Sequence, residues 1–202
     1  MRCSTKDAPL IRGRYGYRVW NGPGSAAHRF ALRCVRDTEG ELRPRMPKID
    51  VAKVPVDTVN MYPDPFWKPV VGRERKRLGN AVGLSQFGVN LTTLKPGTWS
   101  SQRHWHASED EFIYILEGEV VLCEDHGEVV LKPGDAAGWK ANAGNGHCLI
   151  NRSDRDVVYI EIGSRIVNET VVYSDIDMRL ERDKHGVRYL RKTGEPHPPR
   201  KA

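Results

Sequence analysis

Between residues 87 and 162 the chain is a series of short apolar runs, each closed by residues that favour turns. The runs are four to eight residues long and rich in valine, isoleucine, leucine and aromatic residues. Glycine, proline, asparagine and aspartate separate them, as in the Lys-Pro-Gly sequences at 95–97 and 132–134. Strands of this length and spacing are typical of an all-β sandwich or barrel. We predict strands over 87–94, 111–117, 119–123, 128–131, 147–150 and 157–162.

Two more polar segments flank the predicted strands. Residues 46–79 hold three prolines between positions 63 and 69, so we expect an irregular N-terminal strap that Phe66 and Trp67 anchor on the barrel. The basic run at 73–77 in this strap is typical of a solvated face. Residues 166–202 form a C-terminal extension, in which Asp-Lys-His-Gly at 183–186 predicts the turn of a hairpin. The barrel itself is expected to span residues 80–165.

The net charge of +6 lies entirely at the start of the chain. Residues 1–45 hold nine arginines and one lysine against four acidic residues, whereas residues 46–202 hold 22 basic and 22 acidic residues. A phosphate-binding groove needs an excess of basic groups on the folded surface, so this distribution argues against a nucleic-acid partner. We expect residues 1–45 to be a disordered leader or a mis-assigned start before Met46, with an arginine-rich transit peptide as the alternative.

The apolar runs and the cysteines bear on membrane association and on the cellular compartment of the protein. No stretch approaches 18 apolar residues, which argues against a membrane-spanning helix, and we expect no membrane partner. The four cysteines are Cys3, Cys34, Cys123 and Cys148, and none belongs to a Cys-x-x-Cys pair. Cys123 and Cys148 lie in apolar runs, where we expect small buried side chains. These features favour a cytoplasmic protein with reduced thiols.

One stretch carries the residue types of a metal site. His104 and His106 are two residues apart, so in a strand both side chains face the same way. Glu111 begins the next predicted strand after a short turn, and His147 stands where a later strand begins. A hairpin would bring the carboxylate beside the first two imidazoles, and a strand across the barrel would add the third. Three imidazoles and one carboxylate suit Fe²⁺, Mn²⁺, Ni²⁺, Co²⁺, Cu²⁺ or Zn²⁺.

Other side chains near this stretch have two interpretations each. Gln102 shares the face of the two histidines, and it would either reach a ligand or end the strand in solvent. Tyr114 and Trp139 would either line a substrate pocket or belong to the core. A shift of the hairpin register would make Glu109 the carboxylate ligand.

At these residues the chain resembles the cupin superfamily. The run from His104 to Gly118 has the spacing of the first cupin motif: His-x-His, four residues, Glu, six residues, Gly. Residues 144–151 fit the end of the second motif, Gly-x-x-His-x-x-x-Asn. The resemblance covers about residues 81–165 and implies a double-stranded β-helix, the cupin jelly-roll barrel. It also implies a divalent metal ion (Fe, Mn, Zn or Ni) in the barrel mouth, held by His104, His106, Glu111 and His147.

The flanks of the motifs narrow the resemblance further. The sequences at 78–84, 87–91 and 173–178 are similar to those of a group of single-domain bacterial cupins, some of which are labelled sugar-phosphate isomerases. Two departures stand out. Six residues rather than the usual five separate Gly97 from the first histidine, and Asn142 stands where the second motif usually has proline. Neither departure removes an implied ligand.

Two classes of function follow from this resemblance. As an enzyme, the protein would use its metal on a small organic molecule, either as an isomerase or as a dioxygenase. An isomerase needs a general base, and the sequence identifies none outside the ligand set. The inward-facing positions that can be assigned also offer no arginine or lysine for a sugar phosphate. The alternative is a non-catalytic protein that binds or senses a small ligand. Exposed strand edges that need cover favour a homodimer.

Overall fold

The computed structural model describes residues 48–198 and 200, so the predictions for residues 1–45 lie outside the described chain. Strands dominate this part. They are β1 (Val56–Asp57), β2 (Arg73–Lys76), β3 (Phe87–Leu94), β4 (His104–His106), β5 (Glu111–Glu117), β6 (Val120–Glu124), β7 (Gly127–Leu131), β8 (Ala136–Trp139), β9 (Cys148–Ile150), β10 (Val157–Ser164), β11 (Glu169–Tyr173), β12 (Arg179–Asp183) and β13 (Gly186–Leu190). The helices are η1 (Val51–Lys53), η2 (Lys68–Val70) and α1 (Leu78–Ala81). Within the described residues, no helix has the length and hydropathy to cross a membrane.

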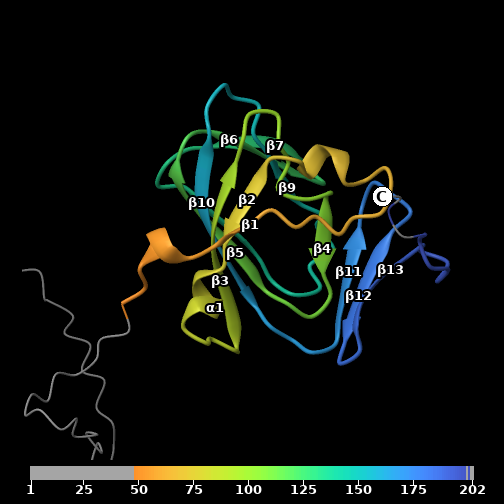
Figure 1. The fold of residues 1–202 in the computed structure, drawn as a ribbon. Coiled ribbons are helices and arrows are strands. Elements are labelled where there is room, and N and C mark those ends of the chain that lie inside the picture. Colours follow the sequence, from red (N-terminus) through yellow and green to blue (C-terminus); the bar gives the residue numbers. More distant parts are fainter. Residues whose placement is uncertain (1–47, 199, 201–202) are drawn as a thin grey trace, which may run out of the picture. The chain divides into compact units, whose positions relative to one another are not determined.

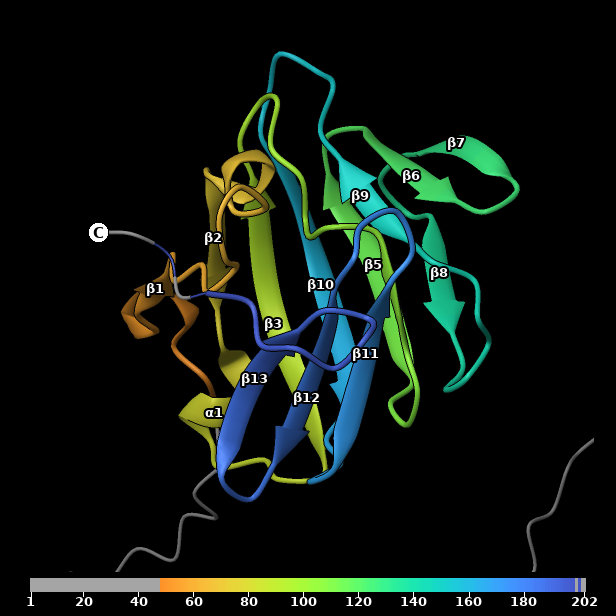
Figure 2. The same cartoon turned by 90° about the vertical axis from the view of Figure 1, so that its right-hand side faces the viewer.

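The strands pair in antiparallel sheets that form two facing layers. A six-stranded sheet has the order β1-β2-β3-β10-β5-β8, and a four-stranded sheet has the order β13-β12-β11-β4. In Figure 2 strands β11, β12 and β13 lie in front of β3, β10 and β5. Figure 1 shows the same two layers from the side. A third sheet, β7-β6-β9, meets the four-stranded sheet through a bridge between His104 and His147. This arrangement is the all-β jelly roll that the sequence predicts.

Strand β5 shows how the sequence positions the core. Ile113 and Ile115 point between the layers and are 2% and 0% exposed, whereas Phe112, Tyr114 and Leu116 lie exposed on the outer face. Full burial of an aliphatic side chain contributes about 1.5–3 kcal/mol, so the inward residues fix which face of the strand is internal. The buried cluster comprises Leu94, Ile113, Ile115, Val120, Leu122, Leu131, Trp139, Leu149, Val157 and Tyr159.

The N-terminal arm contributes to the barrel as well as covering it. Phe66 and Trp67 pack against a second apolar cluster that includes Tyr173 and Met178, as expected of anchors. The first four residues of the basic run form β2, which pairs with β3 and extends the six-stranded sheet. Alternate side chains of β2 therefore face the interior, which an irregular strap would not ensure.

Two turns are set by residues that the sequence singles out. Gly118 joins β5 to β6 with φ of 77°, and a Cβ atom there would lie 2.6 Å from the carbonyl oxygen of Asp156, so only glycine fits. Strands β12 and β13 pair as the C-terminal hairpin, with Asp183 opposite Gly186. This pairing confirms the hairpin predicted around residues 183–186.

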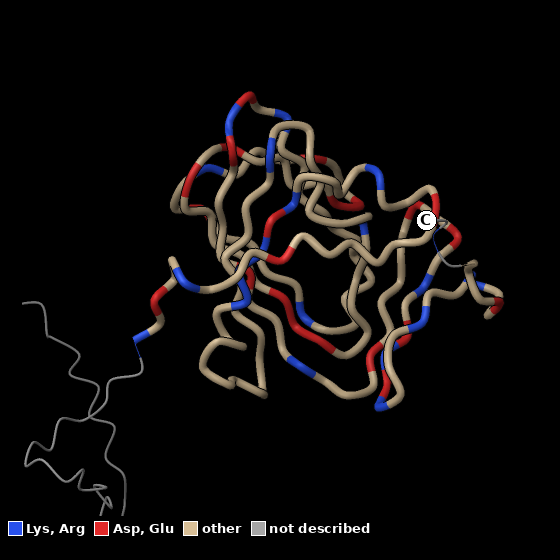
Figure 3. The backbone as a smooth tube through the Cα atoms, in the orientation of Figure 1, with Lys and Arg blue, Asp and Glu red and all other residues tan. Residues whose placement is uncertain are grey.

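Acidic and basic residues are intermixed along the described chain (Figure 3). Residues 46–202 hold equal numbers of basic and acidic residues. The absence of a nucleic-acid partner stays a prediction.

Candidate metal centre

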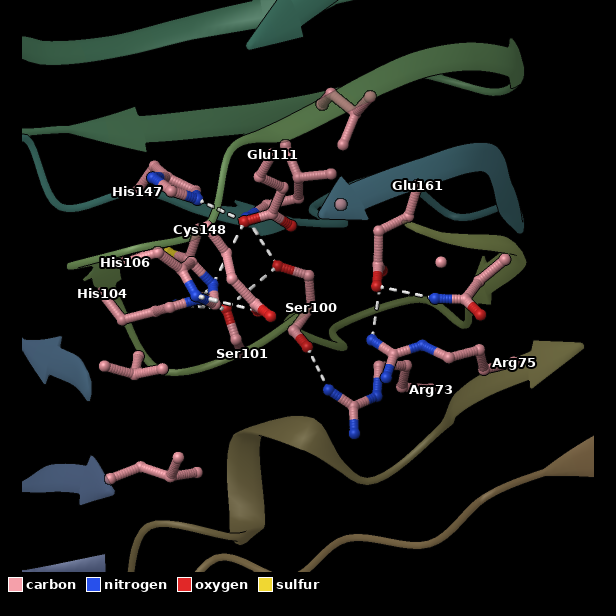
Figure 4. A pocket seen from close by; sticks show the side chains of 18 of the residues that line it. Arg73, Arg75, Ser100, Ser101, His104, His106, Glu111, His147, Cys148 and Glu161 are labelled. Atoms are coloured by element: carbon pink, nitrogen blue, oxygen red, sulfur yellow. Dashed lines mark hydrogen bonds and ion pairs between the residues drawn. The ribbon is translucent and has the colours of Figure 1, made fainter. Parts of the chain in front are cut away.

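The side chains of the four predicted ligands come together from three parts of the chain (Figure 4). His104 and His106 are the two ends of β4, Glu111 is the first residue of β5, and His147 directly precedes β9. Reciprocal backbone hydrogen bonds of 3.1 and 2.9 Å join His104 to His147. Backbone pairing therefore brings together side chains that lie far apart in the sequence.

The ligand atoms of these side chains converge. Nε2 of His104 lies 3.2 Å from Nε2 of His106, which lies 3.6 Å from Oε2 of Glu111. Nε2 of His147 lies 2.9 Å from the same oxygen. The ligand atoms of His104, His106 and Glu111 all lie within 4.8 Å of one another. These three groups are compact enough to hold one metal ion, and His147 adjoins them.

Backbone carbonyl oxygens contact the other ring nitrogen, Nδ1, of His104 and of His147. Nδ1 of His104 lies 2.9 Å from the carbonyl oxygen of Gln102, and Nδ1 of His147 lies 3.4 Å from that of Asn145. Because a carbonyl oxygen can only accept, Nδ1 of His104 carries the hydrogen in the neutral ring and its Nε2 keeps the lone pair. Nε2 of His147 donates to the Glu111 carboxylate, and a metal ion would replace that hydrogen. Outer contacts of this kind orient histidines that bind metals.

His106 has carboxylates on its outer side instead of a carbonyl group. Its Nδ1 lies 3.5 Å from Oε1 of Glu169 and 3.8 Å from Oε2 of Glu109. The Glu169 side chain is 0% exposed and accepts hydrogen bonds from the backbone N–H groups of Ala107 and Ser108. The sequence analysis missed Glu169. It treated Glu109 as an alternative ligand, but the structure places Glu109 behind the ring of His106, so the shifted register is wrong.

The protonation states of the group follow from its burial and its neighbours. Burial, with a smaller contribution from nearby His106, lowers the pKa of His104 to about 3, so this ring is neutral at pH 7. Burial acts to raise the pKa of Glu111, but the hydrogen bond with His147 and the neighbouring imidazoles outweigh it and lower this pKa to about 2. A neutral imidazole and an ionised carboxylate are the states that a metal requires.

The donor set fits a metal ion. Imidazole lone pairs and carboxylate oxygens are all acceptors, and a cation between them is what brings such groups together favourably. Nitrogen and oxygen donors of this kind suit iron, manganese, nickel or zinc, without distinguishing among them.

The structure separates the three predicted pocket residues. Trp139 lines the cavity, and its ring stacks on His147 with centroids 3.7 Å apart and planes at 8°. Gln102 is buried, but its amide donates to the carbonyl oxygen of Phe66 at 2.7 Å in the N-terminal arm. Tyr114 is 41% exposed on the outer face of β5, so its prediction as a pocket residue is wrong. The reason is parity, because Tyr114 lies three residues after the inward-facing Glu111.

The histidines lie at one end of a cavity of about 390 Å³, whose further walls are charged (Figure 4). Glu161 of β10 lines it and accepts hydrogen bonds of 3.1 Å from Arg75 and 3.1 Å from Asn90. Among the described residues, the arginines that line it are Arg73, Arg75, Arg77, Arg165 and Arg182. The cavity therefore holds arginines that were not among the inward-facing positions assigned from the sequence, and the basic run is not simply a solvated face.

The sequence pattern predicts only some of the charged residues that line the cavity. In β10, Val157, Tyr159 and Glu161 recur at every second position, so the inward parity of the two buried residues predicts that Glu161 faces inward as well. Strand β2 has no apolar residue among its four, so no periodicity indicates which of its charges is internal.

Comparisons with known proteins agree with this geometry. The family described as the Cupin domain matches residues 90–163. A crystal structure from Silicibacter pomeroyi, described as a sugar phosphate isomerase from a cupin superfamily, is 43% identical with a TM-score of 0.73, and the match covers 74% of this chain and 96% of that one. The chain belongs to the cupin superfamily.

A second solved structure is more distant from this chain. This protein from Acidithiobacillus ferrooxidans, named provisionally as a sugar phosphate isomerase, is 30% identical with a TM-score of 0.57. The match covers 60% of this chain and 77% of that one. A search of curated proteins gives no match.

The structure explains one departure of this cupin from the usual motifs. Asn142 has φ of 59°, which proline cannot adopt, and its backbone N–H donates to the carbonyl oxygen of His106 at 2.8 Å. The residue that replaces proline thus holds the strand that carries the first two histidines.

Proposed function

We propose that this cupin is a metal-dependent isomerase that acts on a small molecule with a carbonyl group and neighbouring hydroxyl groups. The convergence of three imidazole Nε2 atoms on the Glu111 carboxylate, at one end of a cavity, carries this proposal. His104, His106, Glu111 and His147 would hold the divalent ion. The name of the relative that is 43% identical supports an isomerase over a dioxygenase.

The bound metal would supply a Lewis acid that polarises a carbonyl or hydroxyl oxygen. Isomerisation also requires a group that moves a proton between carbon atoms, and Glu161 suits this role. Gly163 lies opposite Glu111 on the neighbouring strand, which makes Glu161 a diagonal neighbour of Glu111. Its carboxylate lines the cavity, and Arg75 orients it. Glu161 is thus near the metal centre without being a ligand.

Metal content tests the first half of the proposal. Untagged protein analysed by elemental mass spectrometry should hold close to one equivalent of a first-row divalent metal. His104→Ala and Glu111→Ala should lose it, whereas His185→Ala, which removes an exposed imidazole from the tip of the β12–β13 hairpin, should keep it. Wild-type protein that takes up no metal even after reconstitution would end the proposal.

Proton exchange tests the second half. Sugar phosphates incubated with the metal-loaded protein in deuterated water should exchange a carbon-bound proton, detected by NMR. Glu161→Gln should abolish this exchange while retaining the metal. Oxygen consumption in place of exchange would identify a dioxygenase, and neither activity across a broad substrate panel would favour the binding or sensor alternative.

We further propose a cytoplasmic homodimer. The support is the outer face of β5, where Phe112, Tyr114 and Leu116 are each more than 40% exposed, beside Ile160 and Ile162 of β10. Contiguous apolar faces of this kind mark association sites. Light scattering should give twice the chain mass, and Phe112→Glu should give a monomer; a monomeric wild type would refute the dimer. Free Cys123 and Cys148 agree with a reducing compartment.

A further inference from the structure

Three buried polar atoms lie in one row of the six-stranded sheet without a hydrogen-bond partner. They are Nε of Arg75, Oγ1 of Thr92 and the hydroxyl oxygen of Tyr159. The register pairs Arg75 with Thr92 across β2 and β3, and Thr92 with Tyr159 across β3 and β10. Buried polar atoms are nearly always satisfied, and leaving one unpaired costs about 1–3 kcal/mol. Three such atoms in cross-strand neighbours indicate that a bound molecule accepts their hydrogen bonds.

Two of these three residues reach the cavity of the metal centre, and Thr92, which is 0% exposed, lies between them in the sheet. Arg75 and Tyr159 line this cavity, although Tyr159 is only 1% exposed. Burial raises the pKa of the Tyr159 hydroxyl, so this group is a neutral donor. The Arg75 Nε–H and the Tyr159 hydroxyl group can therefore donate to a ligand in the cavity, and the Thr92 hydroxyl group is a further unpaired donor between them in the sheet.

Arg73 adds positive charge to this side of the cavity. Its guanidinium donates to the carbonyl oxygens of Ser100 at 2.5 Å and Val59 at 3.5 Å, and it has no acidic partner among the described residues. Glu161 neutralises Arg75 only. The two arginines and one carboxylate leave an excess of one positive charge beside the unpaired donors. A neutral ligand or a water molecule would satisfy the donors but would leave this charge uncompensated.

We propose that Arg73, Arg75, Thr92 and Tyr159 form an oxyanion subsite that binds a phosphate or carboxylate group of the substrate. This inference rests on the proposed function, because the same molecule would present its reacting end to the metal centre. Ile115, which lies opposite Tyr159, is four residues along β5 from Glu111, or about 13 Å at the rise of a strand. A ligand that contacts both ends therefore has several atoms between its anionic group and its reacting carbon.

Isothermal titration calorimetry with inorganic phosphate and with malonate tests the subsite. Both metal-free and metal-loaded protein should bind at least one of these anions. Arg73→Met should raise the dissociation constant about tenfold or more, and Tyr159→Phe should raise it severalfold, because charge-assisted hydrogen bonds are the stronger ones. Lys76→Met is the matched control, since it removes a positive charge from the other face of β2. This variant should bind the anions with the wild-type dissociation constant.

The outcomes separate this inference from the proposed function. Phosphate binding stronger than malonate binding identifies a phosphate ester as the substrate class, and the reverse identifies a carboxylate. If wild type binds neither anion, or if Arg73→Met and Tyr159→Phe bind them as wild type does, the row holds water only and the subsite is refuted. Anion binding that requires the metal and ignores Arg73→Met also refutes it. Elemental mass spectrometry of the same samples reports on the metal centre independently.

The near-isosteric Thr92→Val provides a readout that a purely structural role would not give. If the hydroxyl serves a ligand, the ligand-free variant should melt at or above the wild-type temperature and should bind the anion more weakly. A lower melting temperature with unchanged anion affinity would contradict the assignment.

Discussion

The two ends of the cavity have opposite chemistry and different origins. At one end, three imidazoles and Glu111 present lone pairs and negative charge, which suit a cation. At the other end, Arg73, Arg75 and Tyr159 present hydrogen-bond donors and positive charge, which suit an anion. The first end is built from two short motifs. The second is built from three strands that pair across long sequence separations.

This difference shows what makes a site recognisable in a sequence. His104, His106 and Glu111 lie within eight residues, so strand parity and one short turn are enough to bring them together. Arg75 enters the cavity only because β2 pairs with β3 in a particular register. No local pattern in β2 specifies that register.

The largest predicted effect concerns the ion pair at the arginine end. Arg75→Met should lower the free energy of unfolding by about 3 kcal/mol, because Glu161 would keep its charge without a cationic partner at 17% exposure. Chemical denaturation would measure this effect. The control is Arg152→Met, which breaks an exposed pair with Glu128 and should cost less than about 1 kcal/mol. Equal losses in the two variants would mean that the cavity does not bury its charges.

At the histidine end of the cavity, the contribution of His104 to the free energy of unfolding depends on pH. The folded state keeps His104 neutral with a pKa of about 3, whereas an unfolded histidine titrates near 6.5. The unfolded state therefore binds more protons between these values, so this stabilisation is complete above pH 6.5 and is lost as pH falls toward 3. Metal-free protein should lose about 2 kcal/mol between pH 7 and pH 5. His104→Gln should flatten this dependence, and an unchanged slope would contradict the assigned burial of the ring.

A smaller effect is expected from the carboxylate behind the metal centre. Glu169→Gln removes charge near Nδ1 of His106 while preserving the shape of the side chain. Metal affinity should fall about tenfold, the lower end of the range for outer partners of metal ligands. Competition with a chelator would measure this change, with the exposed Glu128→Gln as control. An unchanged affinity would restrict Glu169 to its backbone hydrogen bonds.

The smallest effect tests the strand that carries the first two histidines. Asn142→Pro should lower stability by about 1 kcal/mol or more, because proline cannot adopt φ of 59° or donate to the His106 carbonyl. Asn142→Gly keeps both features and should be nearly neutral. A stable proline variant would show that this turn can rearrange to the usual cupin form.

The six strands predicted from the sequence all appear in the structure, because each one alternates or is bounded by turn residues, whereas β8 was not predicted. The prediction over 87–94 coincides with β3, and that over 111–117 coincides with β5. The same parity, correctly applied, would have excluded Tyr114 from the pocket and admitted Glu161. Glu169 could not be found in this way, since nothing near it in sequence marks its place behind His106.

The sequence by itself determined the all-β fold and the grouping of His104, His106 and Glu111, because both depend on residue periods and on turns of a few residues. Only the tertiary structure decided which charges of β2 face the cavity. A strand of four polar residues such as β2 buries nothing of its own that could specify its register, and the pairing with β3 specifies it instead. The donors that face the metal centre across the cavity exist only through that pairing.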